Sequence, residues 1–316
     1  MLRILVVLLC SFVLMLALEV QGEVDSEVPI EFTGQFQVLS EYSNDIVEMR
    51  LGKTEIGIKA ELTKTLGLRM IYKVYSDFKV ALFDAYASWK PIQPIEIQFG
   101  QFKTRFSLEN RMAPYKRDFI EEAVANKLVS TRDFGVGLIL STGMYEGGVA
   151  VINGEGLNKQ DANCKKDIVG YISAMPYKSL LIGTAAYLGY SGPDSSLGEI
   201  ERYNVHLHYR KPFHYIFQTE FTYDRTPEII TKAYYLTIGY NLKEFLPHEL
   251  ILEPLVRFQY IDNSTNLESE QYLTLGVNYY IEENYKVRIQ ANYQDRLSAE
   301  GDNNDSFILG IYYAFN

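Results

Sequence analysis

The sequence has only two cysteines, and the first of them, Cys10, lies in an N-terminal segment that we expect to be removed. The mature chain would then keep Cys164 alone. A single cysteine cannot form an intramolecular disulfide, so the pattern excludes a small secreted domain held together by disulfides.

Long hydrophobic runs are also missing beyond the N-terminus. Arg3 is the only charge before an apolar run from Ile4 to Leu18, which is shorter than the roughly 20 residues that span a bilayer as a helix. A basic residue followed by a short apolar run is typical of an export signal. We therefore expect residues 1–22 to be a signal peptide that is cleaved after Gly22. The alternative, a single membrane helix, is disfavoured because no basic cluster follows the run.

Positive charge is in the minority, with 30 Lys and Arg against 40 Asp and Glu, a formal net charge of −10. Loss of residues 1–22 removes Arg3 and Glu19, so the net charge stays the same. Such acidity argues against nucleic acid as a partner.

Signals of catalysis or metal binding are scarce among the four histidines and the serines. His206 and His208 share one strand face, but no third ligand lies near them in sequence, so a pair that lines a lumen is favoured over a metal site. The loop 153–167 is rich in Asn, Asp and Glu, yet it lacks the EF-hand pattern, and a solvated external loop explains it better than bound calcium. No Gly-x-Ser-x-Gly motif occurs. We expect no catalytic residue, no metal and no cofactor.

What the chain does have is aromatic residues, 25 Tyr and 17 Phe, and strict alternation of apolar and polar residues. From Tyr285 to Gln294, for example, Val287 and Ile289 share a face that opposes Arg288 and Gln290. A membrane protein without spanning helices must be a closed sheet, because hydrocarbon offers no partner to a strand edge. The fold class predicted is therefore all-β, a transmembrane antiparallel β-barrel that forms one domain over residues 23–316.

Turn signals divide the mature chain into about sixteen strands. The ranges are 31–42, 47–62, 67–77, 80–90, 94–104, 134–142, 144–153, 166–175, 178–190, 199–211, 213–225, 230–242, 249–262, 269–282, 284–297 and 304–315. Connections after the even strands are short and those after the odd strands are mostly longer, as expected for periplasmic turns and external loops with both termini on the periplasmic side. Strands between 134 and 190 alternate weakly, either because they face another protomer or because they are rich in glycine. Pro254 lies inside a predicted strand, where we expect a bulge or a misplaced boundary.

Three motifs resemble the phosphate-selective porin O and P family. The segment Phe99 to Glu109 is similar to its Gly-Gln-Phe-Lys-x-Pro-Phe-x-x-Glu signature, with Arg105 in place of the proline, and Arg132-Asp133-Phe134-Gly135 matches its Arg-Asp-x-Gly. The loop 153–167 resembles its Asn-Gly-x-Gly and Asp-x-Asn loop. The resemblance implies a sixteen-stranded homotrimeric porin whose third external loop folds inward and narrows the pore.

One departure from the family concerns selectivity. Arg50-Leu51-Gly52 is present, but Val47-Glu48-Met49 precedes it where many members have adjacent basic residues. Selectivity for phosphate is therefore not carried over with the resemblance.

Selectivity of a channel depends on the side chains that line its constriction. We expect the connection 105–133 to be the inward constriction loop, because its apolar side chains, Phe106 and Ile120 among them, would be poorly placed in water. Basic candidates for the pore lining are Lys103, Arg105, Arg111, Lys116 and Arg117 in or beside the loop, and Lys53, Lys59, Arg69, Lys73, Arg202, Arg210, Arg257, Lys286 and Arg288 on the polar strand faces. For each of these, the alternative is a lumen charge that is paired with a neighbour.

The function predicted is passive diffusion of small hydrophilic solutes through a water-filled outer-membrane channel with a mild preference for anions, since the loop has six basic against five acidic residues. Its partners would be outer-membrane lipid and the solutes themselves. The alternative is a surface β protein whose loops bind a partner while little passes through.

Overall fold

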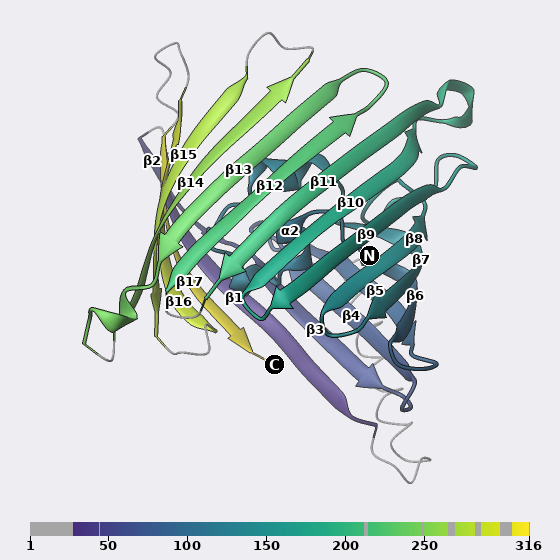
Figure 1. Cartoon of the computed structure of the whole chain (residues 1–316), viewed down its shortest axis with the longest axis horizontal. Helices are drawn as coiled ribbons and strands as arrows, with labels where there is room; N and C mark the ends of the chain where they lie inside the picture. Colours follow the sequence, from purple (N-terminus) through teal and green to yellow (C-terminus); the bar gives the residue numbers. More distant parts are fainter. Residues whose placement is uncertain are drawn as a thin grey trace.

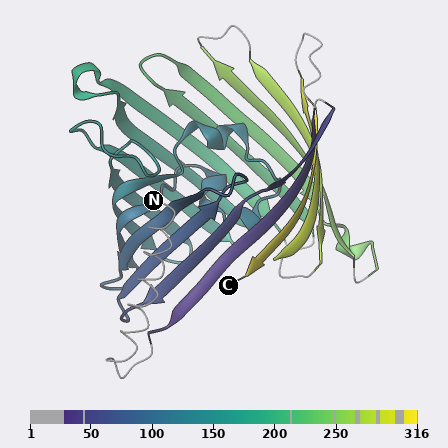
Figure 2. The ribbon, with the colours of Figure 1, turned by 180° about the vertical axis from the view of Figure 1, so that it is seen from behind.

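The structure is a computed structural model that describes residues 28–43, 45–211, 214–247, 250–264, 269–281, 286–297 and 305–315. Within these residues the strands form one closed, tilted antiparallel sheet (Figures 1 and 2). The predicted signal peptide lies outside the described residues, as do the predicted strand ends at 213, 249, 282, 284 and 304. No helix among the described residues is long and apolar enough to cross a membrane.

The strands follow one another around the wall in sequence order. They are β1 (Ile30–Ser43), β2 (Ile46–Leu51), β3 (Thr54–Glu61), β4 (Leu66–Val74), β5 (Val80–Trp89), β6 (Ile95–Lys103), β7 (Arg132–Ser141), β8 (Tyr145–Ile152), β9 (Asp167–Tyr177), β10 (Leu180–Ser191), β11 (Gly198–Arg210), β12 (Tyr215–Arg225), β13 (Ile230–Tyr240), β14 (Ile251–Asn263), β15 (Glu270–Tyr280), β16 (Val287–Arg296) and β17 (Ser306–Phe315).

Pairing between the first and last strands closes the barrel. Gly34 of β1 lies opposite Phe315 of β17 on one side and opposite Ile56 of β3 on the other. Since β2 and β3 follow one another along β1, they count as a single strand position, and the wall has sixteen positions. An even number of antiparallel strands brings the start of β1 and the end of β17 to the same rim.

The break between β2 and β3 is a local bulge at Gly52 and Lys53. The backbone N–H of Gly52 donates to the carbonyl of Gln37, at 2.8 Å, and the N–H of Lys53 donates to the Gln37 side-chain oxygen, at 2.9 Å. A Cβ atom at position 52 would lie 2.4 Å from that oxygen, so a larger residue here would displace the Gln37 side chain from its hydrogen bond with Lys53.

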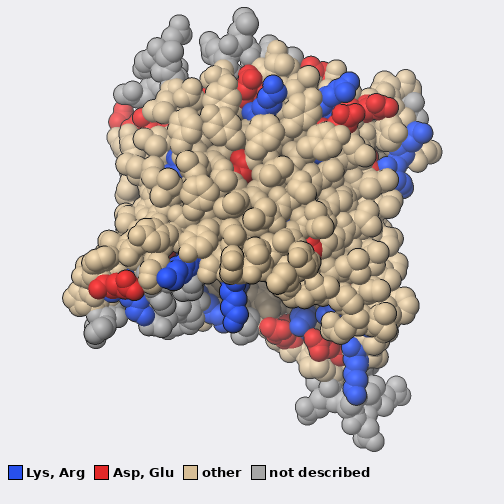
Figure 3. All heavy atoms as spheres, viewed as in Figure 1, with Lys and Arg blue, Asp and Glu red and all other residues tan. Residues whose placement is uncertain are grey.

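The two faces of the wall have opposite character. On β17, Phe307, Ile311 and Phe315 point outward and are exposed, whereas Ile308 and Tyr312 point inward and are buried. Figure 3 shows the same separation on the surface, where charged side chains gather toward the two rims and a broad band of other residues lies between them. An apolar outer band of this kind is favourable only against lipid or another apolar surface.

The sequence-based strand assignment is confirmed, because every predicted range coincides with an observed strand and the ends agree within three residues. Two details differ. The predicted strand 47–62 is divided at Gly52, and the irregularity expected at Pro254 is absent. The expectation at Pro254 is wrong because β14 continues through it without a register shift, while the pairing of β14 with β13 begins only at Leu255. The missing N–H of the proline therefore falls where no residue of β13 is paired with it.

The connection 104–131 turns into the barrel instead of extending from the rim. It contains the short helix α2 (Leu108–Arg111) and the 3-10 turns η1 (Pro114–Lys116) and η2 (Val124–Leu128); Figure 1 shows α2 enclosed by the strands. Ser107 caps α2, because its hydroxyl accepts a hydrogen bond from the N–H of Asn110, at 3.3 Å. Two further turns, η3 (Asp194–Ser196) and η4 (Leu242–Glu244), lie at the rims.

Candidate functional site

Apolar side chains fix the inward loop, residues 104–131, to the inner wall at several places. Phe106 is fully buried and packs with Phe102 of β6 and Val169 of β9. Farther along the loop, Phe119 packs with Ile216 of β12 and Leu255 of β14, and Ile120 packs with Leu39 of β1 and Ile308 of β17. The loop therefore crosses the barrel and contacts opposite parts of its wall.

Glu109 is the centre of a buried polar network. It forms an ion pair with Arg257 of β14, and its second carboxylate oxygen accepts a hydrogen bond from the N–H of Ala123, at 2.8 Å. Arg117 donates to the carbonyl of Glu109, at 3.2 Å. The side chains of Glu109 and Arg257 are 5% and 1% exposed, so this pair holds the loop instead of facing a solute.

Glu122 joins the loop to the bulge between β2 and β3. Its carboxylate pairs with Arg117 and with Lys53, whose ammonium nitrogen lies at 3.4 Å and also donates to the carbonyl of Ile120, at 3.1 Å. Burial acts to raise the pKa of Glu122, but the charges of Lys53 and Arg117 outweigh it and lower the pKa to about 2. Glu122 is therefore ionised at neutral pH and keeps these two cations in place.

Two more arginines of the wall hold the backbone around Asp118. Arg210 of β11 pairs with Asp118 and, at 3.1 Å, with Glu253 of β14. Arg288 of β16 donates to the carbonyl of Pro114, at 3.5 Å. Both side chains therefore contact the inward loop, Arg210 through a carboxylate and Arg288 through a backbone carbonyl.

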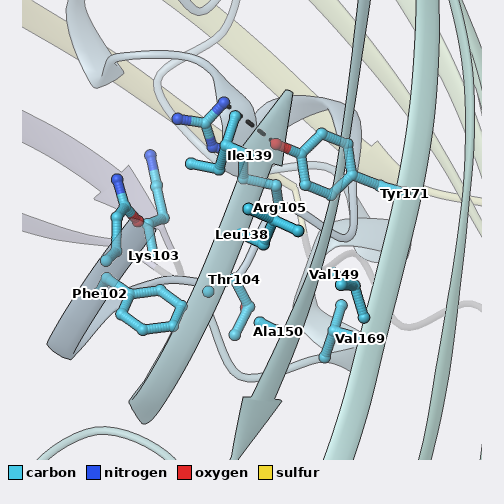
Figure 4. Close-up of a pocket in the computed structure, with 12 residues that line it drawn as sticks. Phe102, Lys103, Thr104, Arg105, Leu138, Ile139, Val149, Ala150, Val169 and Tyr171 are labelled. Atoms are coloured by element: carbon cyan, nitrogen blue, oxygen red, sulfur yellow. Dashed lines mark hydrogen bonds between the residues drawn. The ribbon is translucent and has the colours of Figure 1, made fainter. Parts of the chain in front are cut away.

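A second basic group of the inward loop lies beside the wall and is formed by Arg105 and Arg111. Both guanidinium groups donate to the same oxygen of Glu146 on β8, at 2.9 and 2.6 Å. Arg105 also donates to the hydroxyl of Tyr171 on β9, at 3.3 Å, as Figure 4 shows. Arg111 donates to Ser173, at 2.9 Å. The side chain of Arg105 is 31% exposed, so this cluster is accessible to solvent.

The remaining candidates are dispersed around the wall. Three of them pair with carboxylates: Arg69 with Asp84, which also binds Arg132, Lys59 with Glu31 and Glu61, and Arg202 with Asp224. Lys103 donates to the carbonyl of Met112, and Lys73 lies over the rings of Tyr75 and Phe83. Lys116 is exposed on the loop, and Lys286 lies just before β16. The structure thus brings together Lys53 with Arg117, Arg105 with Arg111, and Arg117 with Arg257. It does not bring Lys59, Lys116 or Arg202 into these groups.

Sequence reasoning missed Glu146, Tyr171 and Asp84. Glu146 and Tyr171 lie on strands whose alternation of apolar and polar residues is weak. They contact Arg105 and Arg111 because the loop that carries these arginines turns into the barrel. Asp84 was not assigned to the lumen, because a bulge opposite Ile71 and Tyr72 places the two successive residues Phe83 and Asp84 both in buried positions. A bulge of this kind breaks the alternation that assigns faces.

Comparison with known proteins agrees with this architecture. Residues 52–167 match the family described as phosphate-selective porin O and P, which confirms the resemblance seen in the motifs. No curated protein sequence matches the chain.

Solved structures with the same fold include porins. An anion-selective porin from Comamonas acidovorans has a TM-score of 0.69 and 11% identity, over 92% of this chain and 100% of that one. OmpT of Vibrio cholerae in a trimer form has a TM-score of 0.68 and 13% identity, over 91% and 99%. OmpF of Salmonella typhi has a TM-score of 0.68 and 13% identity, over 90% and 97%. At these identities the likeness shows the fold alone.

Proposed function

We propose that this chain, whose residues 52–167 match the phosphate-selective porin O and P family, is an outer-membrane porin that allows passive diffusion of small hydrophilic solutes. The observation that carries the proposal is the inward loop, which is fixed by buried contacts to opposite parts of the wall. A loop held in this way reduces the cross-section of the barrel and brings its charges close to any solute that passes.

The preference for anions would be mild. Most basic residues of the loop have a carboxylate partner, as Arg117 has in Glu122 and Arg105 and Arg111 have in Glu146. Paired charges contribute less to the field in the lumen than free ones do. Selectivity for phosphate does not follow from these contacts.

Purified protein in a planar lipid bilayer tests the proposal. We expect long-lived conductance steps and, under a salt gradient, a zero-current potential with the sign of a weakly anion-selective channel. Folded protein, recognised by heat-modifiable migration in gels, that gives no conductance would contradict the channel and favour a β protein whose loops bind a partner.

A homotrimer is part of the proposal, because the family resemblance implies it and OmpT of Vibrio cholerae, a structure with the same fold, is described in a trimer form. Chemical cross-linking of the native membrane protein should give dimer and trimer bands. Export by a signal peptide predicts that N-terminal sequencing of this membrane form begins near Glu23.

A further inference from the structure

The inner wall has a hollow where the small residues Gly137 of β7 and Ala150 of β8 lie side by side. Phe102 and Val169 form its sides, and Arg105 and Tyr171 border it, as Figure 4 shows for the labelled residues. A Cβ atom added to Gly137 would lie 3.2 Å from the ring of Phe102 and 3.8 Å from the Cβ of Ala150, so position 137 faces into the hollow. The space is largely apolar, although Gln98, Lys103 and Thr104 also line it, and it has room for about one or two water-sized groups.

Positive charge exceeds negative charge at the border of this hollow. Arg105 and Arg111 donate to a single oxygen of Glu146. Within the part of the chain that the structure describes, Glu146 is the only carboxylate that pairs with either arginine. One positive charge therefore lacks a matching carboxylate, and planar guanidinium groups bind carboxylates well because they offer paired N–H donors.

The ring of Tyr171 keeps the two arginines in place. The guanidinium carbons of Arg105 and Arg111 lie 5.8 and 5.0 Å from its centre. The ring itself lies against Gly148, where a Cβ atom would come within 2.8 Å of it. The ring is therefore fixed against the wall, and its contacts together with the shared bond to Glu146 position the two arginines before any solute arrives, which lowers the entropic cost of binding.

We propose that this hollow and its two arginines form a subsite for short-chain organic monocarboxylates. The carboxylate would lie against Arg105 and Arg111, and the short alkyl group would occupy the apolar space beside Gly137 and Ala150. A phosphate ion has no apolar part and would leave that space unfilled. The inference rests on the proposed channel function and names one class of solute for it. Arg105 stands where the family signature has proline, so the subsite does not follow from the shared motif.

Block of chloride current in planar bilayers tests the subsite, with sodium propionate and sodium formate added separately as probes. Formate has the carboxylate and lacks the alkyl group. We expect propionate to halve the current at a concentration about ten-fold lower than formate does, since two more carbon atoms leave water. Sodium phosphate should be weaker than propionate.

Two glycine variants separate the alkyl group from the charge. Gly137→Ala fills part of the hollow and should bring the propionate-to-formate ratio close to one. Gly170→Ala is the matched control, because a Cβ atom there meets nothing nearer than a carbonyl oxygen at 4.0 Å, and it should keep the wild-type ratio. If Gly137→Ala does not fold, Ala150→Val tests the same space. Arg105→Gln should weaken block by both carboxylates.

The outcomes distinguish the two levels of the proposal. Wild-type protein that is folded but does not conduct overturns the channel function itself. A conducting wild type that formate and propionate block equally, or that phosphate blocks best, overturns the subsite alone. Equal ratios in Gly137→Ala and Gly170→Ala would also overturn it.

Discussion

Arg257 on β14 and Glu109 in the inward loop form an ion pair in the barrel interior, with 3.4 Å between Nη1 and Oε1. The two residues are 148 positions apart in the sequence. Nearly complete burial of both side chains means that each charge depends on the other, because neither has access to water.

Removal of one charge of this pair should destabilise the protein strongly. We expect Arg257→Gln to lower the free energy of unfolding by about 3–5 kcal/mol, the usual cost of a buried charge without its partner. The temperature at which the folded gel band disappears measures the effect. Combining Arg257→Gln with Glu109→Gln should restore part of the stability, and equal loss in the single and double variants would mean that the charge is not the cause.

Acid should release the loop through Glu122. Since the pKa of Glu122 in the folded protein is about 2, below its ordinary value of 4.5, its contribution to stability is complete above pH 4.5 and is lost as pH falls toward 2. Single-channel conductance should therefore be steady from neutral pH to about pH 5 and become noisier below about pH 4. Glu122→Gln should already be noisy at neutral pH. A variant as quiet as the wild type at neutral pH would argue against this role.

Charge reversal at Lys116 should change selectivity without displacing the loop. Lys116 is exposed, whereas Arg111 and Arg117 are engaged in ion pairs. A charge about 8 Å from a passing ion in water contributes about 0.5 kcal/mol. Charge reversal changes this energy for both ions, and salt screens it over a Debye length of about 8 Å, so Lys116→Glu should reduce the chloride-to-potassium permeability ratio by on the order of a few-fold. The zero-current potential under a salt gradient gives this ratio. Lys165→Glu, in the connection 153–166, is the control, and an equal shift in both variants would place the constriction elsewhere.

The apolar attachment of the loop can be tested at Phe106. Phe106→Ala should cost about 3–5 kcal/mol, because it leaves a cavity against the inner wall. Phe99→Ala removes the same ring from the outer face, where Phe99 is 47% exposed, and should have a smaller effect on conductance. Open-channel noise in a bilayer compares the two. Equal noise in both variants would show that Phe106 does not hold the loop.

Alternation of apolar and polar residues predicted the strands well, because each strand of a closed barrel has an apolar outer face and a polar inner face. On β16, Ile289 and Ala291 face outward, while Arg288, Gln290 and Asn292 are buried inside, as their positions in the sequence indicate. The pattern failed at Gly52 and at Asp84, where an extra residue in the strand changes which side chains point inward.

The ion pairs inside the barrel could not be predicted from the sequence in the same way. The basic residues of the loop were identified, but their partners were not, because Glu146 is 41 positions from Arg105 and 35 from Arg111 and comes close only when the loop turns inward. The sequence therefore assigned Arg257 and Arg288 to the polar strand faces, and in the structure both side chains are buried. It did not show that Arg257 and Arg288 hold the loop, which depends on contacts across the barrel.

The seam between β1 and β17 has a consequence for assembly. Because the pair Gly34 and Phe315 joins the two ends of the described chain, the last strand must be available before the barrel can close. Until then both edge strands have unpaired backbone groups that could associate with other chains. Ile120 of the inward loop packs between Leu39 on β1 and Ile308 on β17, so the loop can reach its final position only after this closure. A chain that stops before β17 should therefore lack both the seam and a correctly placed loop, and such unfinished molecules would be exposed to proteolysis.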